Sequence, residues 1–202
     1  IGALGRDYAG LDLQIRETVT PKLLQELAEG RLDTAIVALP VSEPSLIEVP
    51  LFSEVFMLVR PEADRLKPVP DRERLREMRL LLLEEGHCFR DQVLEVCPEL
   101  SRFSAASDGI QRTFEGSSLE TIRHMVAAGI GITLLPVSAL PVVKDKNALL
   151  RYVPLAAPGA DRRVVLAWRR SFPRMSAIQA LTQTVFACGL DGVRMLPEET
   201  PA

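Results

Sequence analysis

Apolar and polar positions change their spacing several times along the chain, and each spacing predicts an element. Residues 11–15 alternate between apolar and polar side chains, as a half-buried strand does. Residues 33–39 (DTAIVAL) form an apolar run, which is typical of a buried strand in a parallel sheet. Further apolar runs predict strands at 55–59, 80–83, 132–135 and 164–168. Alternating strands and helices indicate an α/β fold with at least one parallel sheet.

Apolar residues with the spacing of a helix occur between these runs. Thr20 can cap the first amides of one helix, and Pro21 suits its first helical position. Gly30 ends that helix. A second helix is expected at 117–128 and a third at 176–187.

The second helix has the clearest boundary signals. Ser117 and Glu120 are spaced as a capping box, and Gly129 ends the pattern. Its predicted core-facing side chains are Leu119, Ile122, Met125 and Val126.

Composition narrows the possible functions. The 202 residues, 47% of them hydrophobic, suffice for one large domain or two small ones. A net charge of -3 argues against a chain that grips DNA or an anionic membrane by itself. No apolar stretch is long enough to cross a membrane. An odd count of three cysteines fits a reducing compartment, so we expect a cytoplasmic location.

The candidate chemistry concentrates in residues 85–97. Gly86 follows an apolar strand and precedes helical spacing, so Cys88 is expected near a helix N-terminus. The helix dipole and free amides stabilise a thiolate there, and His87 and Arg90 can add positive charge or a proton donor. A thiolate attacks peroxide to give a sulfenic acid, which needs a second thiol to become a disulfide.

Cys97 is the candidate second thiol, nine residues further along the chain. In one α-helix nine residues rise about 13.5 Å and turn about 900°, so the two side chains point to opposite faces. A disulfide needs Cα atoms within about 7 Å. A helical reduced state and a bridged oxidised state therefore cannot share one backbone, which is what a two-state switch requires.

Other interpretations of these cysteines stay open at this stage. Cys88 and Cys97 could be small buried hydrophobes, as free cysteines usually are, and Cys188 fits packing behind a helix. The cysteine and histidine spacing does not favour a metal site. Catalysis by a cysteine with His87 or His124 as base is possible in principle.

Three sequence segments resemble one known family. The first is 86–92 (GHCFRDQ), followed by Cys97. The others are 47–52 (IEVPLF) and 119–136, which contains MVAAGIGITLLP. Together they resemble the regulatory domain of LysR-type transcription regulators, over nearly the whole chain. The cysteine segment is similar to that of the peroxide-sensing branch of this family.

The resemblance implies a periplasmic-binding-protein-like α/β fold, with two Rossmann-like subdomains joined by two crossover strands. Subdomain I would comprise residues 1–54 and 165–202. Subdomain II would comprise 55–164 and carry both redox cysteines.

The resemblance also implies roles for individual residues. Cys88 would be the sensing thiol and Cys97 the resolving thiol. His87 would hydrogen-bond peroxide, and Arg90 and Asp91 would orient the loop or take part in proton chemistry. The further expected ligand contacts are Thr20, which could equally be only a helix cap, and Ser117 and Ser118, which we interpret first as capping residues.

The implied partners are hydrogen peroxide and a second copy of the chain, with a tetramer in the full-length protein. DNA would be bound only through a helix-turn-helix domain, which we expect to be absent from this chain. No cofactor, metal or membrane is expected. A second departure from the family lies at Gly2-Ala3, where we expect residues to be missing.

Three functions remain to be compared. The leading hypothesis is a redox-switched transcription regulator, which is a sensor and not an enzyme. The second is a LysR-type module that binds a small anionic metabolite between its subdomains, through helix starts at Thr20, Ser117 and Ser118. The third is a thiol peroxidase or disulfide oxidoreductase, for which the chain lacks a C-x-x-C motif.

Overall fold

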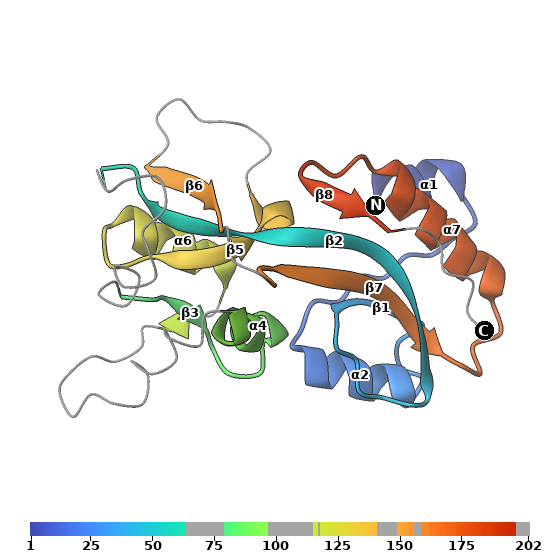
Figure 1. Cartoon of the computed structure of the whole chain (residues 1–202). Helices are drawn as coiled ribbons and strands as arrows, with labels where there is room; N and C mark the ends of the chain where they lie inside the picture. The colour runs from blue at the N-terminus through green and yellow to red at the C-terminus, as the bar shows by residue number, and fades with distance from the viewer. Residues whose placement is uncertain (64–78, 97–114, 117, 141–148, 156–158, 197–202) are drawn as a thin grey trace. The chain divides into compact units, whose positions relative to one another are not determined.

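The computed structural model describes residues 1–63, 79–96, 115–116, 118–140, 149–155 and 159–196 (Figure 1). The helices are α1 (Gly2–Asp7), α2 (Thr20–Ala28), α4 (Cys88–Val96), α6 (Leu119–Ala127), the 3-10 helix η1 (Val137–Ala139) and α7 (Met175–Ala187). The strands are β1 (Thr34–Ala38), β2 (Leu46–Pro61), β3 (Leu82–Leu83), β4 (Glu115–Gly116), β5 (Thr133–Pro136), β6 (Leu150–Pro154), β7 (Asp161–Arg169) and β8 (Val193–Met195).

The chain divides into two compact units. Unit 1 comprises residues 1–53 and 163–202, and unit 2 comprises 54–162. Strands β2 and β7 each continue through a boundary between the units, so the chain passes from one unit to the other twice within regular strands.

Unit 1 is built on antiparallel pairing. Strand β1 pairs with β7, with Thr34 opposite Trp168 and Ala38 opposite Val164. The strand expected at 33–39 is formed, but the expectation that it pairs in parallel is wrong, because it pairs antiparallel with β7. Ile36 is 50% exposed, whereas its neighbours Ala35 and Val37, on the opposite face of β1, are 7% and 5% exposed.

The strand expected at 11–15 is not formed. Leu13 and Ile15 are 41% and 64% exposed, and no regular element covers this segment. Alternation predicts a strand only where a neighbouring strand offers backbone groups to pair with. The expectation that residues are missing between Gly2 and Ala3 stays a prediction. In this chain α1 runs through both residues, and Gly5 N–H donates to Ile1 O at 3.1 Å.

Unit 2 combines antiparallel and parallel pairing. Strand β2 pairs antiparallel with β5 and with β6, while β3 pairs parallel with β4. Leu80 and Ile132 add a parallel bridge. The parallel pairing expected from the sequence is thus confirmed here. The core of the unit is made of buried side chains from β2, β3, β5, α4 and α6.

The helix ends show which capping predictions were correct. Ser118, and not Ser117, is the N-cap of α6, and its Oγ accepts a hydrogen bond from Thr121 N–H at 3.2 Å. Ser117 lies outside the described residues. The cap expected from Thr20 is wrong, because Val19 is the N-cap of α2 and Thr20 is already the first helical residue. The apolar face predicted for α6 is confirmed, since Ile122 and Val126 are buried.

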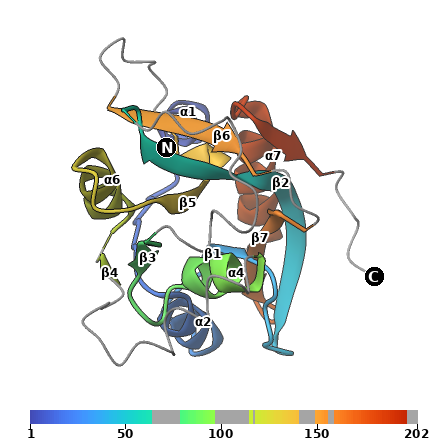
Figure 2. The ribbon, with the colours of Figure 1, turned by 60° about the vertical axis from the view of Figure 1, so that its left-hand side comes forward.

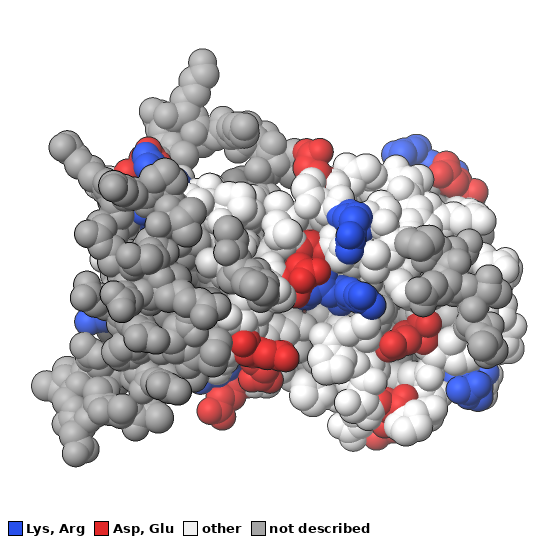
Figure 3. All heavy atoms as spheres, viewed as in Figure 1, with Lys and Arg blue, Asp and Glu red and all other residues white. Residues whose placement is uncertain are grey.

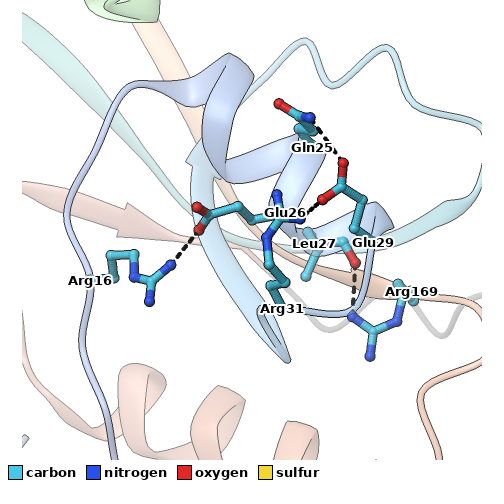
Figure 4. Close-up of polar contacts among 7 residues, drawn as sticks. All are labelled: Arg16, Gln25, Glu26, Leu27, Glu29, Arg31 and Arg169. Atoms are coloured by element: carbon cyan, nitrogen blue, oxygen red, sulfur yellow. Dashed lines mark hydrogen bonds and ion pairs between the residues drawn. The ribbon is translucent and has the colours of Figure 1, made fainter.

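Polar contacts fix the end of α2 (Figure 4). Arg169 Nη1 donates to Leu27 O at 2.8 Å and also to Leu32 O, beyond the turn at Gly30. Gly30 has a φ of +81°, which favours glycine. The buried carboxylate of Glu26 is paired with Arg16 at 2.7 Å, which ties the segment before α2 to the helix.

The surface seen in Figure 3 carries acidic and basic side chains of the described residues in mixed order, without a broad basic patch on that face. No helix among the described residues is long and apolar enough to cross a membrane.

Candidate redox site on helix α4

The site begins at a sharp turn between β3 and α4. Leu83 is buried at the end of β3, and Gly86 follows with a φ of +94°. That conformation is unfavourable for side chains with a Cβ, so glycine permits the turn. The chain then enters α4 at Cys88, and both views show helix α4 beside strand β3 (Figure 1 and Figure 2).

Cys88 is the first helical residue of α4 and carries a free thiol. It is partly exposed, and the first turn closes through a 2.9 Å hydrogen bond from Arg90 N–H to His87 O. Amides without helical partners surround this position, and their dipoles favour negative charge. The predicted location of the thiol at a helix N-terminus is confirmed.

Helix α4 is attached to unit 2 through one face. Phe89 and Val93 are its buried apolar side chains, at 8% and 1% exposure. Asp91 and Glu95 lie on the exposed face. A narrow crevice between α4, β3 and α6 has no room for a water molecule, so the contact is dry.

Two polar side chains are buried on the same helix. Arg90 is 8% exposed, and its Nη1 donates to Leu83 O at 2.9 Å. This bond closes the loop that carries His87 and Cys88, because it joins the residue before the turn to the first turn of the helix. Gln92 is also 8% exposed. Arg90 is thus buried and bonded to the start of the loop, whereas Asp91 is exposed in the first turn, where a carboxylate is favoured by the dipole.

Sequence reasoning missed a second set of residues beside Phe89. Its ring meets the ring of Phe56 edge-on, with centroids 5.4 Å apart, and the Arg162 guanidinium lies 5.2 Å from the Phe89 centroid. Arg162 Nε donates to Glu54 Oε1 at 2.8 Å. The sequence did contain a signal for Glu54, because a carboxylate in a mainly apolar, buried strand indicates a charged partner.

That the remaining predicted site residues form one ligand site stays a prediction. Thr20 belongs to unit 1 and Cys88 to unit 2. Ser118 is exposed and its hydroxyl is engaged in capping α6. Cys97 and Ser117 lie outside the described residues.

Two further points concern the described part of the chain: the burial of Cys188 and possible groups of metal ligands. Cys188 follows α7 and is exposed, so the expectation that it packs in the core is wrong. Its position after the last helical residue places it beyond the apolar face. No group of three or more histidine, cysteine or carboxylate side chains within the described ranges could hold a metal ion.

Comparison with known proteins identifies the family. Residues 1–187 match the model of the LysR substrate binding domain. The "Probable hydrogen peroxide-inducible genes activator" of Streptomyces viridosporus is 41% identical over 86% of this chain and 55% of its own length. The "DNA-binding transcriptional dual regulator OxyR" of Escherichia coli is 37% identical over 93% of this chain and 60% of its own length.

A solved structure supports the same assignment. The reduced form of OxyR from N. meningitidis is 37% identical, with a TM-score of 0.86, over 97% of this chain and 90% of that chain. The chain belongs to the LysR family and has the periplasmic-binding-protein-like mixed α/β fold of its substrate-binding, or regulatory, domain. Within that family it is an OxyR-like domain, related to transcription regulators and not to enzymes.

The chain spans a little over half the length of the two relatives described above.

Proposed function

We propose that this domain senses hydrogen peroxide through Cys88 and reports the event by a disulfide with Cys97. The observation that carries the proposal is the position of the free Cys88 thiol, at the first residue of the nine-residue helix α4. The name of the Streptomyces viridosporus relative, a probable hydrogen peroxide-inducible genes activator, agrees with it.

The chemistry takes two balanced steps. The Cys88 thiolate attacks one oxygen of H₂O₂, the O–O bond breaks, and with one proton the products are Cys88 sulfenic acid and water. The Cys97 thiol then attacks the sulfenic sulfur and releases a second water as the S–S bond forms. Two electrons pass from the two thiols to the peroxide. His87 and Arg90 flank the reacting sulfur in sequence and are the proposed proton donor and loop-orienting residue.

The second step requires a change of backbone. The first and last residues of helix α4 lie about 12 Å apart along its axis, whereas bridged Cα atoms lie within about 7 Å. Bridging therefore unwinds α4 or moves its end, and where the whole helix unwinds, Phe89 and Val93 leave their buried positions. This rearrangement is the proposed signal.

The other expectations from the family belong to the same proposal. Thr20, Ser117 and Ser118 are proposed to contact peroxide or another ligand near Cys88. The units described above are proposed as regulatory subdomains I and II, and the domain as a homodimer, tetrameric in the full-length protein. DNA would be bound in the cytoplasm through a separate helix-turn-helix domain.

Thiol mapping tests the proposal directly. Wild type and Cys88→Ser are treated with about one equivalent of hydrogen peroxide, and their disulfides are identified by mass spectrometry. Wild type should form a Cys88–Cys97 bridge rapidly, and Cys88→Ser should remain reduced. If Cys88 oxidises no faster than a free thiol, a domain that binds a small anionic metabolite becomes the better account.

A further inference from the structure

Glu54 is a buried carboxylate that the peroxide chemistry does not use. It is 2% exposed, although it lies within an otherwise apolar part of β2. Its Oε1 accepts from Arg162 Nε at 2.8 Å, and its Oε2 accepts from the Ser138 amide at 3.0 Å. Both oxygens thus have donors, which a buried charge requires.

The partner of Glu54 reaches the redox helix. The Arg162 guanidinium lies 5.2 Å from the centroid of the Phe89 ring, a distance at which a cation and an aromatic face attract. Phe89 is the second residue of α4 and follows Cys88 directly. The Arg162 side chain is 17% exposed, so this contact is only weakly screened by solvent.

The same strand supplies a second contact to Phe89. Phe56 is two residues beyond Glu54, so both side chains point to one face of β2. The rings of Phe56 and Phe89 meet edge-on at 5.4 Å. The Phe89 ring is therefore held by Phe56 directly and by Glu54 through Arg162.

We propose that Glu54 is a positioning residue for the redox switch: through Arg162 it holds Phe89, and with it the first turn of α4, in the reduced helical state. The inference rests on the proposed function, because it assigns Glu54 control over how readily α4 opens for Cys97. Removing the charge releases Arg162 from its fixed place beside Phe89. The helix then opens more often, and the sulfenic acid is converted to the disulfide sooner.

Glu54→Gln tests this proposal, because glutamine keeps the size but offers an N–H₂ group where a second acceptor is needed. In the reduced protein, amides of 91–96 should exchange hydrogen roughly tenfold faster, while amides of 122–127 in α6 should not change. After a peroxide pulse, the sulfenic acid trapped by a dimedone probe should disappear about tenfold sooner than in wild type.

Glu62→Gln is the matched control. Glu62 lies just beyond the end of β2 and also pairs with an arginine, Arg151, at 2.7 Å, but this pair is exposed, at 49% and 42%, whereas the Glu54 pair is buried. It should leave both measurements at their wild-type values. A double variant, Glu54→Leu with Arg162→Leu, removes both charges and keeps the test valid if Glu54→Gln folds poorly. It should open α4 as Glu54→Gln does.

Two outcomes would overturn the proposal. Unchanged exchange in α4 and an unchanged sulfenic acid lifetime would show that Glu54 does not govern the helix. Equal acceleration in α4 and α6 would show a purely structural role. Failure of wild type to form the disulfide would instead reject the proposed function. The exchange measurement would still test whether Glu54 holds α4 closed in the reduced protein.

Discussion

At the scale of single residues, the described structure separates side chains that hold the loop from those that merely lie near it. Arg90 and Asp91 are neighbours in sequence, yet Arg90 is buried against a backbone carbonyl and Asp91 faces solvent. A buried hydrogen bond leaves an unsatisfied group when one partner is removed, whereas an exposed carboxylate is replaced by water. Loss of the Arg90 side chain should therefore lower the free energy of unfolding more than loss of the Asp91 side chain.

Arg90→Met should lower the free energy of unfolding by about 1–3 kcal/mol, because Leu83 O loses its donor inside the unit. Urea unfolding of the reduced protein measures this change. Arg151→Met is the control, because Arg151 is 42% exposed and its removal should have a much smaller effect. Equal midpoints for Arg90→Met and wild type would show that Arg90 does not hold the loop.

A second prediction at this scale concerns Glu62. The hydrogen bond from Arg151 holds the pKa of Glu62 below its ordinary value of 4.5, and the charge of that guanidinium acts in the same direction. The contribution of this pair to stability is therefore complete above pH 4.5 and is lost as the pH falls through the lowered pKa.

Carboxyl NMR titration should show the pKa of Glu62 rising toward 4.5 in Arg151→Met. The pKa of Glu48, which burial raises, should stay where it is, because Glu48 owes its shift to desolvation. A Glu62 titration that is identical in both proteins would contradict the assigned cause.

At the scale of elements, periodicity predicted which side chains of a segment can be buried, but not which other element the segment pairs with or packs against. The helix at 117–128 and the strand at 164–168 were recognisable because one face or a whole run is apolar. The segment 11–15 has an equally good pattern and forms no strand. Strand order and pairing depend on residues far apart in sequence, so β1 could not be assigned to an antiparallel pair in advance.

The candidate site was likewise predictable where its residues are close in sequence, and not where they are far apart. Cys88 and Arg90 lie in one short segment, and the strand, glycine and helix signals around them placed both correctly. Glu54 and Arg162 are separated by 108 residues, and only folding joins them. Local patterns contain no information about such a contact.

Gly131 provides a test of element packing. A Cβ at this position would lie 2.4 Å from Arg79 O, where the backbone of residues 79–81 hydrogen-bonds with Ile132. Gly131→Ala should lower the free energy of unfolding by about 1–3 kcal/mol, because backbone must move.

Thermal or urea unfolding measures this effect, with Gly5→Ala as the matched control. Gly5 lies within α1, and a Cβ there meets nothing within 4 Å. That variant should be about 0.5–1 kcal/mol more stable than wild type, because alanine favours helices. A Gly131→Ala protein as stable as wild type would show that the two segments can separate freely.

At the scale of the whole molecule, the two units have separate cores. The core that receives Phe89 and Val93 belongs to unit 2, whereas Trp168 and Phe172 pack in unit 1. If Cys88 is oxidised as proposed, the core of unit 2 should therefore be perturbed first. The strands β2 and β7, which continue between the units, are the covalent routes by which the change can reach unit 1.

One equivalent of peroxide should cause a partial loss of helical circular dichroism at 222 nm, because bridging unwinds part of α4. Dithiothreitol should restore the signal. Cys97→Ser is the control, since it can form the sulfenic acid but not the intramolecular bridge, and it should keep its helix. An oxidised wild type with an undiminished signal would mean that the bridge forms without unwinding.

Helix α4 contributes only two buried apolar side chains to a core that is otherwise made by β2, β3, β5 and α6. When the helix leaves, most of that core remains assembled. The oxidised domain therefore retains the surface on which the helix was formed, and reduction needs only to return a short segment to it. Under the proposed mechanism the domain could thus be reset many times without passing through a globally unfolded chain, so one molecule could report successive exposures to oxidant.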